Sequence, residues 1–193
     1  DVTVDRAALR AFGVELPDGM LGGRGTAALV IDTPPGQAPA FSLSSTLAGL
    51  SLSVPQLGWR LSESGTGEFR IGGRLGQPVS IEGLLLNAGG LEARGDLELT
   101  AQGGFAALDL ARLRVGGWMD VAARIVSNGA GRAPRIELGS GSVDFRSAPT
   151  GGSGSGAGGG QEGGSLRMAL DRLTVTDTIA LTNFRGDFTT AQG

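Results

Sequence analysis

The chain has 193 residues, of which 40% are hydrophobic and 18% charged, enough for one domain or for a section of a larger one. Its net charge is -3 and its basic residues, all arginine, are scattered among acidic ones, which argues against nucleic acid as a partner. Histidine, cysteine, lysine and tyrosine are absent. This excludes Ser-His and Cys-His nucleophile pairs, Schiff-base lysines and zinc sites built from Cys and His.

Helical signals occur near the start of the chain, where Asp5 to Phe12 are expected to form a short helix that Gly13 ends. After it, apolar residues recur at every second position, the period of a half-buried strand. The expected strands are Gly25 to Asp32, Ala40 to Thr46, Leu50 to Val54, Gly67 to Leu75, Val79 to Leu86, Leu91 to Ala101, Ala106 to Val115, Met119 to Val126, Arg135 to Leu138, Ser142 to Arg146, Leu166 to Val175 and Thr178 to Thr189.

Residues 150 to 164, TGGSGSGAGGGQEGG, are predicted to be a flexible insertion within a single domain of residues 1 to 193, because strand-like sequence resumes after them. Their GxGxxG match lacks the strand and helix that a dinucleotide site requires. Gly-Gly and Asn-Gly connectors between the strands indicate hairpins. About ten to twelve strands at about 4.8 Å spacing would make a sheet near 50 Å wide, which must curl.

The fold class expected is therefore all-β: a mostly antiparallel, strongly curled meander sheet, forming an open groove or a flattened barrel, with a short N-terminal helix. The candidate site is the apolar face of this sheet, because the strand Leu91 to Thr100 separates an apolar side from a charged side. Either the core of a two-sheet sandwich or a groove for acyl chains explains the same alternation. The groove candidates are Val79, Ile81, Leu91, Leu97, Leu99, Leu108, Leu110, Val121, Ile125, Met168 and Leu170.

Three other kinds of site are weighed against structural explanations. Acidic residues such as Glu92, Asp96 and Glu98 could form a glycosidase-like pair, but with Arg94 among them a solvated face with ion pairs is favoured. Trp59 and Trp118 follow glycine turns, where packing is favoured over ligand stacking. No loop carries the carboxylates of a calcium site, so no metal or other cofactor is expected.

Three stretches, VSIEGLLLNAGGLEARGDLEL, LDLARLRVGGWMDVAARI and LRMALDRLTVTDTIALTNFRGDFTT, resemble the AsmA-like proteins of Gram-negative cell envelopes, in particular their YhdP-like branch. The opening DRAALRAFGVELPDGMLGGRGTAAL and LAGLSLSVPQLGWRLS are similar to the same branch. This resemblance implies a periplasmic bridge-like lipid-transfer protein, anchored in the inner membrane, whose β-groove carries phospholipid for outer-membrane biogenesis. It offers no catalytic residues.

The resulting expectation is a fragment of such a protein, beginning at Asp1 instead of Met, that binds or conducts phospholipid acyl chains and is not an enzyme. Membrane association would come through missing parts of the full-length chain. Two alternatives remain: a structural or adhesive β-module of the cell envelope without ligand, and a carboxylate enzyme, which needs two acidic side chains converging in a cleft.

Overall fold

The computed structural model describes residues 1–7, 19–76, 79–101, 103–129, 132–149 and 165–189. The protein is all-β, as predicted, and its strands form one sheet of eleven and one of three. The large sheet has the order β1-β3-β4-β7-β8-β9-β10-β11-β12-β13-β14, so its two outer strands, β1 and β14, are not paired with each other. The sheet is therefore open. Most of the expected helix and the Gly/Ser-rich segment 150–164 lie outside the described residues.

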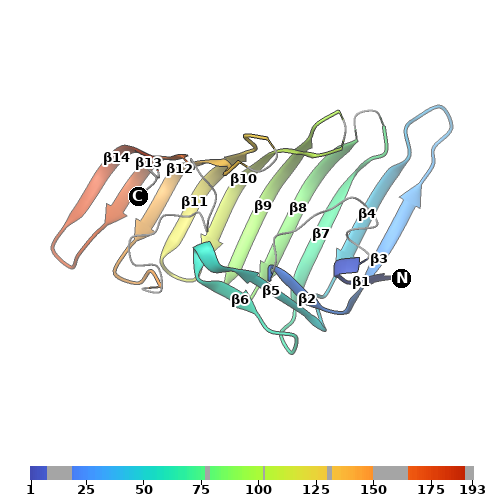
Figure 1. Cartoon of the computed structure of the whole chain (residues 1–193), viewed down its shortest axis with the longest axis horizontal. Coiled ribbons are helices and arrows are strands. Elements are labelled where there is room, and N and C mark those ends of the chain that lie inside the picture. Colours follow the sequence, from blue (N-terminus) through green and yellow to red (C-terminus); the bar gives the residue numbers. More distant parts are fainter. Residues whose placement is uncertain (8–18, 77–78, 102, 130–131, 150–164, 190–193) are drawn as a thin grey trace.

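Figure 1 shows the strands of the large sheet side by side along the longest axis of the molecule. Their bounds are β1 (Val2–Val4), β3 (Gly25–Asp32), β4 (Ala40–Ser45), β7 (Gly67–Arg74), β8 (Ser80–Ala88), β9 (Leu91–Leu99), β10 (Phe105–Val115), β11 (Met119–Val126), β12 (Arg135–Asp144), β13 (Ser165–Thr174) and β14 (Ala180–Thr189). The small sheet contains β2 (Leu21–Gly23), β5 (Leu50–Val54) and β6 (Trp59–Leu61), with a 3-10 turn, η1 (Pro55–Leu57), between the last two.

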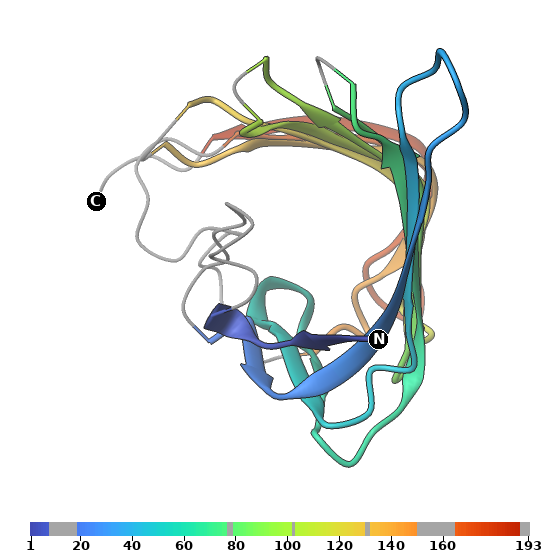
Figure 2. The same ribbon diagram turned by 90° about the vertical axis from the view of Figure 1, so that its right-hand side faces the viewer.

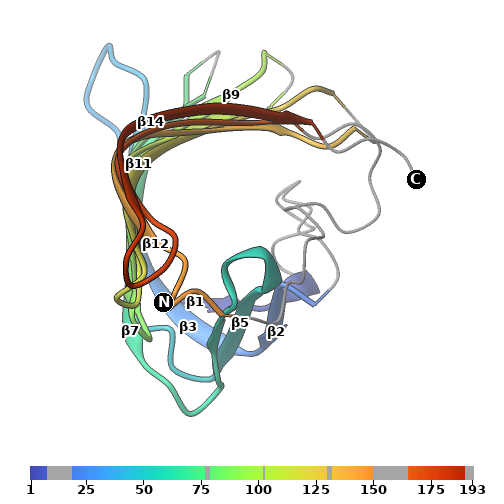
Figure 3. The ribbon, with the colours of Figure 1, turned by 90° about the vertical axis from the view of Figure 1, so that its left-hand side faces the viewer.

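The strands of the large sheet bend, so that the sheet wraps around a concave side (Figures 2 and 3). Irregularities in strand pairing lie in the middle of alternate strands and account for this bend. One falls between Ile81 and Leu84 of β8, one between Leu110 and Leu113 of β10, and one where β12 passes Val121 and Ala123 of β11. Because these bulges recur in every second strand from β8 to β12, this whole part of the sheet bends, and the bend is not limited to one hairpin.

One expectation about the C-terminal half is wrong. In place of the two strands expected at Arg135 to Leu138 and Ser142 to Arg146 there is a single strand, β12, which ends at Asp144. It accommodates the glycines between the two segments because Gly141 adopts a positive φ of 128° at the bulge. The sheet is mostly antiparallel, as predicted, with one parallel pair of strands, β12 and β13. Because these two strands are parallel, the connection between them must return the chain to the end of the sheet where β12 begins. A hairpin turn cannot do this.

The small sheet folds back over the concave side at one end of the strands (Figures 2 and 3). Its leucines and Trp59 belong to the same buried cluster as the apolar residues of β9 to β13. Trp59 is 6% exposed, and its indole Nε1 donates hydrogen bonds to the carbonyl oxygens of Ala88 and Gly89 at 3.2 and 3.0 Å. The packing role predicted for Trp59 is thus confirmed, and its ring fastens the small sheet to the β8–β9 turn.

The core of this fold predicts the effect of a cavity on stability. Leu170 of β13 has an exposed fraction of 0%, whereas Leu181 of the edge strand β14 is 41% exposed. We expect Leu170→Ala to lower the free energy of unfolding by about 2–5 kcal/mol and Leu181→Ala by less than about 1 kcal/mol, because only the first leaves a cavity. Urea denaturation followed by circular dichroism measures both, and similar losses would contradict this placement of the core.

Candidate functional site

The candidate site is a row of apolar side chains that crosses the concave face of the large sheet. Pairwise registers connect one residue on each of the ten strands from β3 to β14, and none of them is charged. All are half-buried or exposed. We call this set the open row: Ile31, Phe41, Gly73, Ile81, Leu97, Leu108, Ile125, Ile136, Leu166 and Phe188.

A second apolar row lies nearer the small sheet and has the opposite exposure. Its members are 2% to 4% exposed, and all of them belong to one buried cluster with leucines of the small sheet. We call this set the sealed row: Ala88, Leu91, Val115, Met119, Val143 and Leu173. The sequence pattern is identical in both rows, so only the position of the small sheet decides which apolar residues remain accessible.

The eleven groove candidates divide between these regions. Four of them, Ile81, Leu97, Leu108 and Ile125, lie in the open row. Leu91 lies in the sealed row, and the protein packs around the next four almost completely: Leu110, Val121, Met168 and Leu170. Leu99 is half-buried opposite Phe105, and Val79 is half-buried just before β8, in no strand.

Several members of the open row were not singled out from the sequence. Ile31 and Phe41 come from β3 and β4, Ile136 from β12 and Phe188 from β14. Each lies in a strand expected from its alternation, but pairing register, which a local pattern does not contain, determines that they continue one row. Ile31 and Phe188, at opposite ends of the row, are 53% and 49% exposed.

The length of the open row is set by strand spacing. Ten strands at about 4.8 Å separation make a row about 45 Å long, which exceeds the roughly 30 Å thickness of the hydrocarbon core of a bilayer. Because the row follows the stacking direction of the strands, it runs along the longest axis of the molecule (Figure 1). Large apolar surfaces exposed in this way are typical of sites that bind apolar partners.

The opposite face of the same strands carries the charges. Asp96, Asp109, Arg124, Glu137 and Arg167 occupy consecutive positions in one cross-strand row from β9 to β13. The Arg124 Nη1 atom donates to both carboxylate oxygens of Asp109 at 2.6 and 2.7 Å. The solvated face with cross-strand ion pairs, predicted for this side, is confirmed.

Carboxylates on this face also stabilise the bulges. Asp96 accepts a 2.9 Å hydrogen bond from the backbone N–H of Gly83, and Asp171 accepts one of 2.9 Å from that of Gly141. Gly83 and Gly141 both have positive φ and lie at irregular positions of β8 and β12. These two aspartates therefore accept hydrogen bonds from backbone N–H groups that have no partner in the irregular strand pairing. Their carboxylates thus have a structural role.

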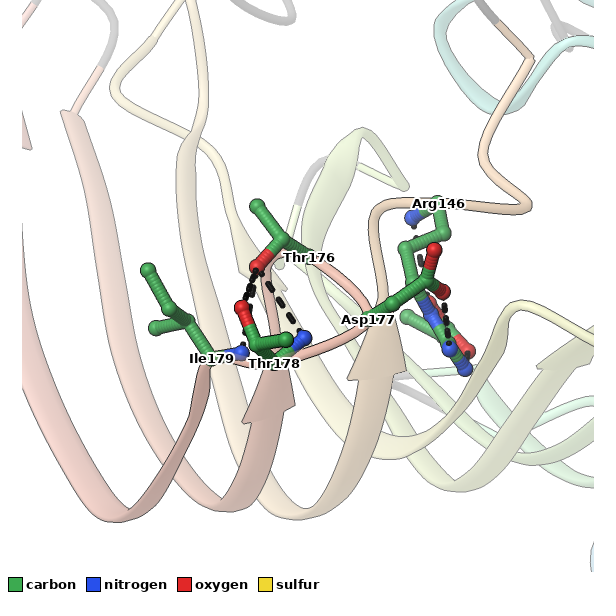
Figure 4. Close-up of polar contacts among 6 residues, drawn as sticks. Arg146, Thr176, Asp177, Thr178 and Ile179 are labelled. Atoms are coloured by element: carbon green, nitrogen blue, oxygen red, sulfur yellow. Dashed lines mark hydrogen bonds and ion pairs between the residues drawn. The ribbon is translucent and has the colours of Figure 1, made fainter.

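The β13–β14 turn is joined to the end of β12 by an arginine (Figure 4). The Arg146 guanidinium donates to Asp144 at 2.6 and 2.9 Å and, through Nη1, to Asp177 in the turn at 2.8 Å. Hydrogen bonding to Asp144, followed by that to Asp177, raises the pKa of Arg146, and the same contact lowers the pKa of Asp144. Within the turn, the Thr176 hydroxyl accepts a hydrogen bond from the backbone N–H of Ile179 at 3.1 Å.

Other types of site receive little support in the described part of the chain. It contains no group of three or more acidic, His or Cys side chains able to hold a metal ion. Within the same residues, no helix is long and apolar enough to cross a membrane. A shallow hollow of about 660 Å³ lies against the small sheet, lined by serines together with Arg60 and Glu63, and it includes none of the groove candidates.

The charged face predicts how stability depends on pH. A hydrogen bond from Arg112 lowers the pKa of Asp120 below its ordinary value of 3.8, so this carboxylate stabilises the fold above that value and loses its contribution as the pH falls through the lower, folded-state pKa. Asp120→Asn should remove under about 1 kcal/mol at pH 7, because the pair is exposed, and should reduce the acid-induced loss of stability.

Urea denaturation at pH 7 and near pH 3 provides the measurement. Arg112→Gln, which removes the donor and leaves the carboxylate, should flatten the same part of the stability profile. Parallel pH profiles for the wild type and Asp120→Asn would contradict the assignment.

Comparisons with known proteins add no relative to this picture. No protein-family model, no curated protein and no solved structure matches the chain. The resemblance to AsmA-like proteins therefore depends on residue patterns, and the site is interpreted from the geometry of the chain itself.

Proposed function

We propose that the chain is a section of a periplasmic AsmA-like protein of the YhdP-like branch, which binds or conducts phospholipid acyl chains along the open row. In this proposal it contributes to outer-membrane lipid homeostasis, and the full-length protein is anchored in the inner membrane. The observation that carries the proposal is the open row itself: uncharged, partly exposed and continuous across ten strands.

The physical argument concerns apolar surface left in water. Burying a methylene group contributes about 0.8 kcal/mol, so ten methylenes half-covered by the row would gain about 4 kcal/mol. This gain is moderate, which suits a surface that must also release its ligand. Since no charged residue interrupts the row, a chain moving along it would meet no strong barrier from strand to strand.

The convex face supports the orientation of the ligand. Its arginines and acidic residues form ion pairs with one another, as Arg124 does with Asp109 and Arg167 with Asp187 at 2.7 Å. Acyl chains would therefore lie on the concave side, with the headgroups at the open margin in water. The mechanism is passive and needs no catalytic group, in keeping with a sequence that lacks His, Cys, Lys and Tyr.

A charge placed in the open row tests the proposal. Leu97→Asp puts a carboxylate in the middle of the row, while Val30→Asp puts one at an exposed position, 60% accessible, outside the open row on β3. Burying an ionised carboxylate beside an acyl chain is costly. We expect Leu97→Asp to reduce phospholipid binding at least about tenfold and Val30→Asp to leave it unchanged.

Binding is measured with a phospholipid that carries an environment-sensitive fluorophore on one acyl chain, and confirmed by native mass spectrometry after incubation with phosphatidylethanolamine and phosphatidylglycerol vesicles. Circular dichroism and urea denaturation establish that both variants fold. A folded wild-type protein that takes up no lipid would overturn the proposal and favour a structural β-module without ligand. Equal losses in both variants would show that the open row is not the binding surface.

A further inference from the structure

The last strand of the large sheet presents an unpaired edge. β14 pairs with β13 on one side, and no other strand in the described part of the chain pairs with it on the other. It is ten residues long and contains neither proline nor lysine, two of the usual means by which proteins protect an edge strand. Among the described residues, no strand occupies the outward N–H and C=O groups of β14, so we treat them as available to another strand.

The side chains of β14 are also incompletely covered. On the concave face, Leu181 continues the sealed row beside Leu173, and Phe188 ends the open row beside Leu166. Their exposed fractions are 41% and 49%, although their neighbours on β13 are buried or half-buried. On the other face, Arg185 donates only to the carbonyl oxygen of Phe184, at 3.1 Å, and forms no ion pair among the described residues. A strand added here would cover apolar surface and could supply an anion to Arg185.

The sequence of the edge is complementary to itself. Residues 184 to 188 are Phe-Arg-Gly-Asp-Phe. If two such segments pair antiparallel with Gly186 opposite Gly186, Arg185 of each lies opposite Asp187 of the other, and Phe184 opposite Phe188. Opposite charges and aromatic residues at directly opposed positions are favourable cross-strand pairs. A shift of two residues would place Arg185 opposite Arg185 or Asp187 opposite Asp187, and a shift of one would separate the two opposite charges, so charge favours one register.

We propose that the Phe184 to Phe188 edge of β14 pairs with the same edge of a second copy of this chain, related by a two-fold axis. Two-fold symmetry is the commonest form of self-association, and it requires a surface that is complementary to itself. An axis perpendicular to the sheet keeps both concave faces on the same side. Phe188, which ends the open row of each copy, then lies opposite Phe184 of the other copy, so the apolar concave faces of the two copies become continuous.

The other end of the sheet does not have this property. There β1 covers Gly25 to Ala27 of β3, and no strand in the described part of the chain pairs with Ala28 to Asp32 on that side. This segment is Ala-Leu-Val-Ile-Asp, with one charge at its end and no oppositely charged residue. Antiparallel self-pairing of the β3 edge would therefore form no ion pair. The β14 edge is the test of the proposal, and the β3 edge is its control in the same molecule.

The experiment reverses the charge of Arg185 or of Asp187. It uses delipidated protein, so that its outcome does not depend on the proposed lipid binding. An interface of one strand pair is small, and we expect the wild-type dimer to dissociate at about 1–100 µM in sedimentation velocity. In Arg185→Asp, two carboxylates face two carboxylates in the paired edge. In Asp187→Arg, guanidinium groups face guanidinium groups. Each variant alone should dimerise at least about tenfold more weakly, because like charges are opposed.

The decisive measurement mixes the two variants. In the proposed register every carboxylate of Arg185→Asp lies opposite a guanidinium group of Asp187→Arg, so the mixture should form a heterodimer with about wild-type affinity. Val30→Arg at the β3 edge should change nothing, and circular dichroism establishes that each variant folds. A wild-type chain that is monomeric at 200 µM or more, or variants that fail to associate when mixed, would overturn the proposal.

Discussion

The separation of apolar and charged side chains onto the two faces of a bent sheet determines the rest of the structure. From β8 to β13, apolar residues lie on the concave side and ion-paired charges on the convex side. Bulges in the middle of β8, β10 and β12 bend these strands while keeping the faces in register on either side. Without the bulges, the same sequence pattern would produce a twisted but less strongly wrapped sheet.

The bulges depend on polar interactions as much as on glycine. At Gly83 and Gly141, a carboxylate from the neighbouring strand accepts the N–H that the ladder leaves unpaired. At β10 and β13, two related stretches, LDLARLRV and MALDRLTV, each place two exposed residues between buried leucines. The acidic residues that could suggest catalysis are thus used to shape the sheet, and the function we propose is assigned to the apolar face.

The small sheet converts a uniform apolar face into two different surfaces. It covers the sealed row, where Leu91 and Val143 are almost inaccessible, and leaves the open row in contact with solvent. This arrangement combines the two explanations of the alternation that the sequence left open. One part of the face is a sandwich-like core, and the other is a surface available to an apolar ligand.

The sequence by itself determined the all-β class and most strand positions, because alternation and turn residues are local signals. Gly25–Asp32 and Met119–Val126, for example, have the bounds expected. Alternation also placed the charged residues and the leucines on opposite faces. These predictions succeeded because the period of a strand is two, whatever its partners are.

Only the tertiary structure decided which strands pair, where the sheet bends and which apolar residues remain exposed. The parallel pairing of β12 with β13 depends on the path of the chain between them. The burial of Leu170 depends on the packing of neighbouring elements. Leu97 and Leu91 have the same local pattern, yet one is half-buried in the open row and the other sealed at 3% exposure. The difference is set by long-range packing of the small sheet, which no local periodicity encodes.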